Sequence, residues 1–154
     1  MPGPLNHRSR EVAEDIHRVF QAAYRIEAEL IGVTDFPPLE REPEQIRTAP
    51  TCFLGCWSGT ELAAVMEYEC NGMHLSIDSL VVHPHYFRQG LASNLLRSRL
   101  ALADWQTANV ETAAKNDPAI ALYERFGFSV SARWATKAGI DKVRLSLARA
   151  NNDR

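Results

Sequence analysis

Two short motifs in the second half of the chain place residues with binding and proton-transfer chemistry at fixed spacing. The first is V-x-P-x-x-x-x-x-G-x-A over residues 82–92, with its glycine at Gly90. It joins a short apolar segment to a leucine-rich one, which is the order strand, tight loop, helix. Glycine lets a ligand approach the backbone closely, and the N–H groups of a helix N-terminus attract anions. The first motif therefore predicts an anion-binding loop.

The second motif is N-x-x-A-x-x-L-Y-x-x-x-G-F over residues 116–128. Its asparagine, Asn116, is a residue type that caps helices. Its tyrosine, Tyr123, is a neutral phenol that can donate a proton. The motif predicts a helix that begins near Asn116 and ends at Gly127.

Hydrophobic spacing predicts the elements that position these motifs. A helix is expected over residues 10–31, which Ser9 can cap and Gly32 can end. The Pro-rich, charged segment 33–50 is too broken for regular structure, apart from a turn of helix near residues 44–47.

Three strands joined by tight turns are expected after this segment. The Asn71-Gly72 pair predicts a type I′ turn between the second and the third. Strand alternation would place Asp78 on the same face as Ser76 and Leu80. The three strands are predicted over residues 51–57, 61–70 and 73–82.

The rest of the chain alternates helices and strands, and it predicts an α/β (α+β) layered sheet. For the helix over residues 117–126, Asp117 is expected at the N-cap, followed by a proline at the first helical position. For the helix over residues 91–105, Leu95 and Leu102 are expected on the apolar face. The predicted helices cover residues 91–105 and 117–126, and the predicted strands cover residues 109–114, 128–134 and 142–149.

Bulk properties narrow the class of protein. The 154 residues predict one domain over residues 1–154. A net charge of −2, with Lys and Arg scattered along the chain, predicts no nucleic-acid or membrane partner. We expect a cytoplasmic protein, because neither a membrane span nor a signal peptide is recognisable.

The cysteines and histidines do not suggest a metal centre. Cys52, Cys56 and Cys70 are odd in number and lack a C-x-x-C pair, so reduced, buried thiols in strands are expected. His83 and His85 are close in sequence, but no second group of ligating residues completes a site. No metal is predicted.

Together, in this order and separated by one helix and one strand, the two motifs resemble those of the GNAT superfamily of acetyl-CoA-dependent N-acetyltransferases. The resemblance is specific over residues 73–134. It implies the GNAT fold, a central mixed, mostly antiparallel sheet with helices on both faces. GNAT domains commonly begin with a strand, for which only residues 4–8 remain here, so that strand is short or absent.

The resemblance implies that acetyl-CoA is the co-substrate and that backbone groups hold most of it. The strand before the loop would contact the acetyl group and the pantetheine arm, the loop would wrap the pyrophosphate, and Asn116 and Tyr123 would lie near the arm and the sulfur. Phe87 stands where the family usually has Gln or Arg, and Arg88 can supply the missing charge. The strand and loop residues implied are Leu80, Val81, Val82, Arg88, Gln89, Gly90, Leu91, Ala92 and Ser93.

The resemblance also implies direct attack of an amine on the thioester, in a V-shaped opening between residues 80–82 and 110–112. Tyr123 would protonate the departing thiolate. Glu111 matches a glutamate that acts as the base in GNAT enzymes that acetylate ribosomal-protein N-termini. Asp78 is an alternative base, and Glu67, Glu69 or a chain of waters are others.

We therefore predict an N-acetyltransferase that acts on a primary amine, with a small amine favoured as acceptor. A protein N-terminus or lysine is an alternative acceptor, and a non-catalytic acyl-CoA-binding module is an alternative function. The sequence lacks the motifs of a general nucleotide-binding site: the Lys-Ser/Thr ending of a P-loop and the acidic residue of a dinucleotide site. A homodimer is left open. Acceptor determinants are expected in residues 10–31, the Pro-rich segment and residues 134–139. Acids and a phenol that could attract a cationic amine there are Tyr24, Glu27, Glu29 and Asp35.

Overall fold

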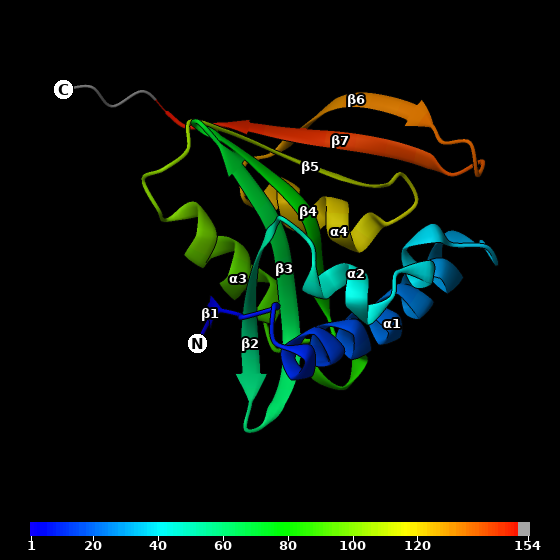
Figure 1. Cartoon of the computed structure of the whole chain (residues 1–154). Coiled ribbons are helices and arrows are strands. Elements are labelled where there is room, and N and C mark those ends of the chain that lie inside the picture. Colours follow the sequence, from blue (N-terminus) through cyan, green and yellow to red (C-terminus); the bar gives the residue numbers. More distant parts are fainter. Residues whose placement is uncertain (151–154) are drawn as a thin grey trace.

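A computed structural model describes residues 1–150, in which one seven-stranded mixed sheet carries helices on both faces (Figure 1). The strand order is β1-β2-β3-β4-β5-β7-β6, and only the β4–β5 pair is parallel. The predicted fold class is confirmed. The last four residues of the predicted domain lie outside the described residues.

The strands are β1 Gly3–Pro4, β2 Cys52–Ser58, β3 Glu61–Asn71, β4 His74–Val82, β5 Thr107–Ala113, β6 Ser129–Ala135 and β7 Asp141–Ala148. The α-helices are α1 Arg10–Ile31, α2 Pro43–Arg47, α3 Leu91–Leu100 and α4 Asp117–Arg125. Two short 3₁₀ helices are η1 Pro37–Glu40 and η2 Pro84–Tyr86. The first strand, expected to be short or absent, is present and two residues long.

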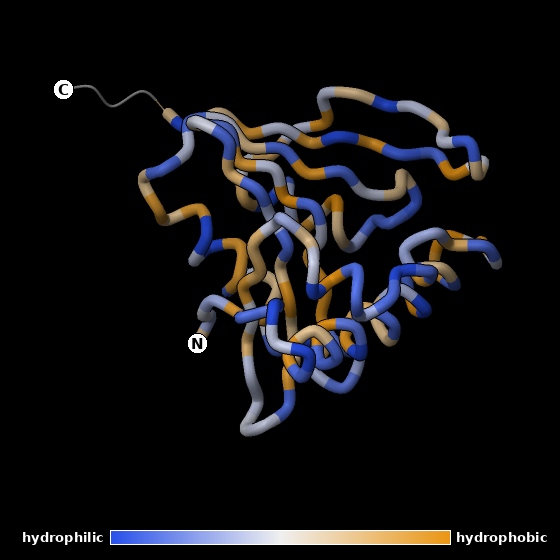
Figure 2. The backbone as a smooth tube through the Cα atoms, in the orientation of Figure 1, coloured by the Kyte–Doolittle hydropathy of each residue, from blue (hydrophilic) through white to orange (hydrophobic). Residues whose placement is uncertain are grey.

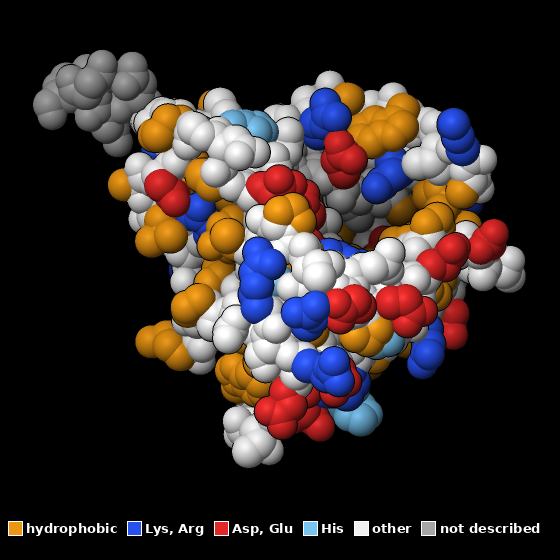
Figure 3. All heavy atoms as spheres, viewed as in Figure 1, with side chains coloured by type: hydrophobic (Ala, Val, Ile, Leu, Met, Phe, Trp, Pro, Cys, Tyr) orange, Lys and Arg blue, Asp and Glu red, His pale blue; other side chains and the backbone are white. Residues whose placement is uncertain are grey.

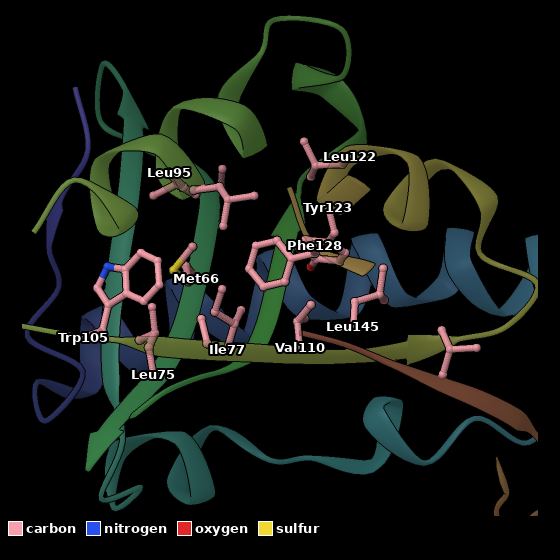
Figure 4. Packing of buried hydrophobic residues seen from close by; sticks show 14 of the residues in the cluster. Met66, Leu75, Ile77, Leu95, Trp105, Val110, Leu122, Tyr123, Phe128 and Leu145 are labelled. Carbon is pink, nitrogen blue, oxygen red and sulfur yellow. The ribbon is translucent and has the colours of Figure 1, made fainter. Parts of the chain in front are cut away.

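Two apolar layers hold the helices to the sheet. On one face α1 buries Ile16 and Phe20 against Val65 and Val81 of the sheet. On the other face α3 and α4 cover a larger cluster, which includes Leu95 and other residues drawn in Figure 4. The tube in Figure 2 shows apolar residues concentrated where the helices meet the sheet. Burial of these faces supplies most of the force that orders the helices.

Strands β4 and β5 part halfway along the sheet. They pair from His74 opposite Thr107 to Ile77 opposite Val110. Beyond these residues β4 continues beside β3, and β5 continues beside β7. One backbone edge of each strand is therefore left without a strand partner, in the V-shaped opening that the family resemblance implies.

A β-bulge in β4 lies where the opening begins. Glu67 faces Ser79 and Tyr68 faces Ile77, so Asp78 is an extra residue without an opposite partner on β3. The bulge reverses the alternation of the strand. Leu80 therefore packs on the same side as Ile77, and the prediction that it shares a face with Ser76 is wrong.

Helix α3 is shorter than its leucine spacing predicts, because side-chain contacts end it. It stops at Leu100, and Leu102 is half exposed instead of buried. The Leu100 carbonyl accepts hydrogen bonds from Trp105 Nε1 at 3.1 Å and from Arg149 Nη2 at 2.6 Å. Satisfied in this way, the last carbonyls need no further helical turn.

Two local predictions also need correction, and the predicted N-cap position of Ser9 is confirmed. Of the two residues in the β3–β4 turn, only Gly72 has positive φ (60°), which fits a type II′ turn rather than type I′. Asn116, not Asp117, is the N-cap of α4, and its side chain accepts a bond from the Ala119 amide at 3.3 Å. Ser9 occupies the N-cap of α1 without a side-chain bond.

The cysteines differ in burial. All three are free thiols in strands, as predicted. Only Cys56 is buried, whereas Cys52 is exposed and Cys70 is partly exposed. The expectation that all three are buried is therefore wrong, because β2 and β3 continue beyond the layers that the helices cover.

Within the described residues, no helix is both long enough and apolar enough to cross a membrane.

Candidate active site

Two cavities meet where β4 and β5 part. The first, which we call the sheet cavity, has a volume of about 690 Å³ and lies between α1, η1 and the β4, β5 and β7 strands. The second, the loop cavity, has a volume of about 660 Å³ and lies between α1, the η2–α3 loop and α4. Both are lined by Glu27, Leu80, Val81, Asn116, Ala119 and Tyr123.

The η2–α3 loop presents free backbone N–H groups to the loop cavity. Arg88 and Gly90 have left-handed φ angles of 66° and 73°. Such left-handed residues turn successive N–H groups toward one point, where they can hold an anion. The first amide bonded inside α3 is that of Asn94, which donates to the Gly90 carbonyl at 3.0 Å. The preceding amides of the helix are therefore available to a ligand.

Gly90 itself leaves room for a ligand. No atom lies within 4 Å of the position that a Cβ would take there. A side chain would project into open space, and its backbone would be strained at this φ. Of the nine strand and loop residues predicted to hold the co-substrate, all but Gln89 line the loop cavity.

The wall of the loop cavity is apolar on one side. Phe87, Ile26 and Leu30 are large hydrophobic residues that are 45%, 41% and 50% exposed. All three line this cavity. Such exposed side chains suit a ligand that has an apolar part next to its anionic part.

Tyr123 lies at the junction of the two cavities. It is only 4% exposed, and its ring packs at an angle against Phe128 with centroids 5.8 Å apart (Figure 4). Burial raises the pKa of its hydroxyl, and the neighbouring Tyr24 and Glu27 raise it further. The hydroxyl therefore stays protonated and can donate a hydrogen bond to a ligand in either cavity.

Asn116 combines a structural and a site position. Its side-chain oxygen caps α4 while the residue lines both cavities. Burial raises the pKa of the adjacent Glu27 carboxyl, and the Asn116 side chain and Lys142 oppose this rise. The predicted capping role is confirmed, and the amide nitrogen faces the Glu27 carboxyl.

Asp78 is the least compensated acid of the sheet cavity. Removal from bulk water raises the pKa of its carboxyl to about 7, with further contributions from the negative charges of Glu67 and Glu69. Arg41 opposes this effect but does not cancel it. A carboxyl with a pKa near neutrality can accept a proton and release it again.

Glu67, one of the alternative bases, is already engaged. It is 4% exposed and receives two bonds from the Arg41 guanidinium, at 2.6 and 3.0 Å. The Thr51 hydroxyl donates a third at 2.6 Å. Glu67 therefore anchors the segment that carries Arg41 to β3, and it is a poor acceptor for a substrate proton.

Glu111 lies on β5 at the opposite wall of the sheet cavity. One of its oxygens accepts bonds from Nε and Nη2 of Arg144, at 3.2 and 3.0 Å. Arg144 in turn lies over the Trp134 ring, 5.5 Å from its centroid. The structure thus brings Glu111 and Asp78 to one cavity but gives only Glu111 an arginine partner.

Several lining residues were not singled out from the sequence. Arg41 comes from the segment predicted to be irregular, and Ser79, which accepts a bond from the Tyr24 hydroxyl at 2.9 Å, follows the bulge. Lys142 on β7 was also missed. No sequence signal marks them, because their partners are distant in the chain. Of the four predicted amine-attracting residues, Tyr24 and Glu27 line the sheet cavity; Glu29 and Asp35 line neither cavity.

Comparison with known proteins places these features in a family. Residues 13–128 match the model of the acetyltransferase (GNAT) family. The UPF0157 protein YqkA of Bacillus subtilis is 35% identical over 125 residues, which is 80% of this chain. The chain spans 36% of the length of that curated relative.

Solved structures share the fold. The ribosomal-protein-S18-alanine N-acetyltransferase from Escherichia coli aligns with a TM-score of 0.76 and 20% identity, over 100% of this chain and 97% of the other. The PaiA N-acetyltransferase from Thermoplasma acidophilum, solved in complex with coenzyme A, aligns with a TM-score of 0.71 and 15% identity, over 94% and 96%.

The raised pKa of Asp78 has a testable effect on stability. Its folded-state pKa of about 7 lies above the ordinary value of 3.8, so the folded state loses stability as pH rises through this range. Asp78→Asn removes the titration. We expect the unfolding free energy of the variant, relative to wild type, to increase between about pH 4.5 and pH 8 in urea denaturation.

Asp104→Asn is the matched control with the opposite sign. Arg99 holds the pKa of the Asp104 carboxyl below its ordinary value. That variant should be destabilised at pH 8 and approach wild type as pH falls. A parallel pH dependence of the two variants would contradict the shift assigned to Asp78.

Proposed function

Since the chain belongs to the acetyltransferase (GNAT) family, we propose that it transfers an acetyl group from acetyl-CoA to a small primary amine by direct attack. The observation that carries the proposal is the meeting of the two cavities at Tyr123 and at residues 80–81, where β4 leaves β5. A donor in the loop cavity and an acceptor in the sheet cavity would then react at this junction. The proposal assigns the activity to one domain over residues 1–154.

The loop cavity fits the pyrophosphate and pantetheine of acetyl-CoA. The free N–H groups before and within the first turn of α3 would bind the phosphate oxygens. The unpaired edge of β4 at residues 80–82 would bind the amide groups of the pantetheine arm, much as a further strand would. Asn116 and the apolar wall would contact the rest of the arm.

Phe87 departs from the usual polar residue without removing the phosphate site. The anion is bound mainly by backbone groups, which do not depend on the side chain at this position. Phe87 instead adds exposed apolar area beside Ile26 and Leu30. We expect the loss of a charged contact to be offset in part by apolar contact with the co-substrate.

The reaction removes two protons from the ammonium form of the amine and supplies one to sulfur. The amine loses the first proton before its lone pair forms the new N–C bond and the second as the C–S bond breaks, and the departing thiolate takes up one proton. We assign the first proton to Asp78, whose pKa of about 7 suits a base at neutral pH. Tyr123 donates to the departing sulfur, and its raised pKa keeps that donor present.

Glu111 remains the alternative base, directly or through water. Its ion pair with Arg144 occupies one carboxylate oxygen and leaves the other free. It could therefore also act by holding a water molecule between itself and the amine. The two acids lie on different walls of one cavity, so variants can separate them.

A protein N-terminus is the second candidate acceptor. It is favoured by the opening of the sheet cavity onto the surface, where Figure 3 shows a hollow bordered by acidic and basic side chains. It is also favoured by the S18-alanine N-acetyltransferase that shares this fold. Release of CoA with a panel of small amines and short peptides tests both acceptors in one assay.

The loop cavity yields a prediction for Gly90→Ala. A Cβ at φ 73° strains the backbone by about 1 kcal/mol and projects into the proposed phosphate site. We expect the Kd for acetyl-CoA, measured by calorimetry, to rise at least about tenfold, since a charge-assisted hydrogen bond contributes roughly 1.5–3 kcal/mol.

Gly59→Ala is its matched control, because Gly59 has a φ of 61° and equally open surroundings but lies outside both cavities. It should lower Tm by a similar amount and leave the Kd unchanged. Equal Kd values for the two variants would show that the η2–α3 loop does not bind the phosphate.

Tyr123→Phe tests the proton donor. The ring and its packing against Phe128 remain, so we expect binding of acetyl-CoA to be retained while kcat falls roughly 100-fold, the usual size of an acid-catalytic effect. Tyr68→Phe, outside both cavities, is the control and should keep wild-type turnover. Unchanged turnover of the Tyr123 variant would remove its assigned role.

The base is identified by the pH dependence of kcat/KM. With Asp78 as base, the wild-type value should rise with pH around the pKa of about 7, since the carboxyl must be ionised to accept the proton. Asp78→Asn should abolish this rise and reduce the value roughly 100-fold. Glu111→Gln should keep the rise. The reverse outcome would assign the base to Glu111.

A protein that binds acetyl-CoA but releases no CoA with any acceptor would be an acyl-CoA-binding module. In that case the proposal of catalysis would be wrong while the loop-cavity site would stand.

A further inference from the structure

Apart from the ion-paired Arg41 and Glu111, the charged side chains that line the sheet cavity fall on two walls of opposite sign. Acids come from α1 and β4, as Glu27 and Asp78. Lysines come from β7 and the turn before it, as Lys142 and Lys137. Since β4 and β7 lie on opposite sides of the opening, unlike charges face each other across the cavity.

The arginines near this cavity are already neutralised. Arg41 forms a two-point ion pair with the buried Glu67. Arg144 pairs with Glu111. These four charges therefore stabilise the walls and contribute little attraction for a ligand.

Lys142, in contrast, makes no ion pair with any described residue. The strand register explains this difference. Arg144 lies opposite Glu111 on β5, whereas Lys142 lies opposite Ala113, whose methyl group offers no acceptor. Its neighbour on β6 is Trp134, which also carries no negative charge. The strand thus directs the partly buried Lys142 toward the cavity, where none of the described acidic side chains forms an ion pair with it.

The acid that Lys142 influences from the other wall is Glu27. Lys142 lowers the pKa of the Glu27 carboxyl, but the two groups form no ion pair. The remaining charged groups that face the cavity are Asp78, Lys137 and the paired Arg41 and Glu111. Lys142 and the acidic wall therefore face one cavity of about 690 Å³ with opposite charges and without an ion pair between them.

We propose that Lys142 forms an anion subsite in the sheet cavity and that the acceptor is a small amine that also carries a carboxylate or phosphate group. This inference rests on the proposed function, which places the acceptor in the sheet cavity. The ammonium group of such an acceptor lies toward Asp78, and its anionic group lies toward Lys142. Lys137, on the exposed turn at the cavity rim, adds a second positive charge.

The inference distinguishes between classes of amine. A simple alkylamine would satisfy the acidic wall and leave Lys142 without a partner. A diamine would place its second cation beside Lys142 and be repelled. Only an acceptor with charges of both signs complements both walls, and the gain comes from electrostatic pairing within a site partly shielded from water.

The test compares amines that differ only in the anionic group. The pairs are 4-aminobutyrate with butylamine, β-alanine with propylamine, and O-phosphoethanolamine with ethanolamine. We expect the anionic member of a pair to have a kcat/KM about tenfold higher or more, the effect of one charge-assisted hydrogen bond. The carboxylate and phosphate pairs identify which anion is preferred, and a peptide with an acidic second residue tests a protein source.

Lys142→Met removes the charge and keeps most of the side-chain length. It should abolish the preference by raising KM for the anionic amines, with kcat/KM for alkylamines and the Kd for acetyl-CoA unchanged. Lys142→Glu should reverse the preference toward diamines. Arg133→Met, on the exposed face of β6 and outside both cavities, is the control for loss of a positive charge and should keep the preference.

Equal turnover of the two members of every pair by wild type would overturn the anion subsite while leaving the acetyltransferase proposal intact. An equal loss with both kinds of amine in Lys142→Met would also overturn it. If no amine is acetylated, calorimetry with the CoA-bound protein still decides: 4-acetamidobutyrate should bind more tightly than N-butylacetamide, and Lys142→Met should remove the difference.

Discussion

The parting of β4 and β5 is the constraint on which the site depends. Parallel pairing covers only the four positions from His74 to Ile77, after which each strand keeps a partner on its outer side alone. Backbone N–H and C=O groups on the inner edges must then be satisfied by water or by a ligand. Helices α1 and α4 approach the opening from opposite faces, and Tyr123 and Asn116 reach it from α4. The parting of the two strands thus creates both the unpaired backbone edge and the cavity beside it.

The bulge at Asp78 adds an acid to this opening. Without the bulge, Leu80 would face α1 and Val81 would face α3 and α4. The bulge instead places Leu80 against the cluster under α3 and α4, and Val81 against α1. Asp78 is left at the start of the gap, near Glu67, which Arg41 and Thr51 hold in place. The pairing of Arg41 with Glu67 keeps the guanidinium from pairing with Asp78, so the pKa of Asp78 remains high. The bulge in β4 therefore determines both the packing of Leu80 and Val81 and the position of the acid with the raised pKa.

Prediction from sequence succeeded where local chemistry decides the structure. Helix α1 with its left-handed Gly32 and the glycine loop at Gly90 both depend on residues within one or two turns of each other. It failed where distant contacts decide. The Leu100 end of α3 depends on Arg149, which is 49 residues away, and the ion pair of Arg41 spans 26 residues. The shift of Leu80 to the opposite face depends on register with β3, for which alternation along β4 gives no sign.

The difference between local and distant determinants also separates the two halves of the proposed site. Backbone groups line most of the proposed donor side, so a motif of small residues around Gly90 predicts it, and a change such as Phe87 would leave those groups in place. Side chains from α1, η1, β4 and β7 line the proposed acceptor side. We expect selectivity for the acceptor to come from charged side chains without an ion-pair partner, because a charge already neutralised by a neighbour attracts a ligand weakly. Lys142 has no ion-pair partner among the described residues, because the strand register places it opposite Ala113. Arg144, two residues further along β7, lies opposite Glu111 and forms an ion pair with it.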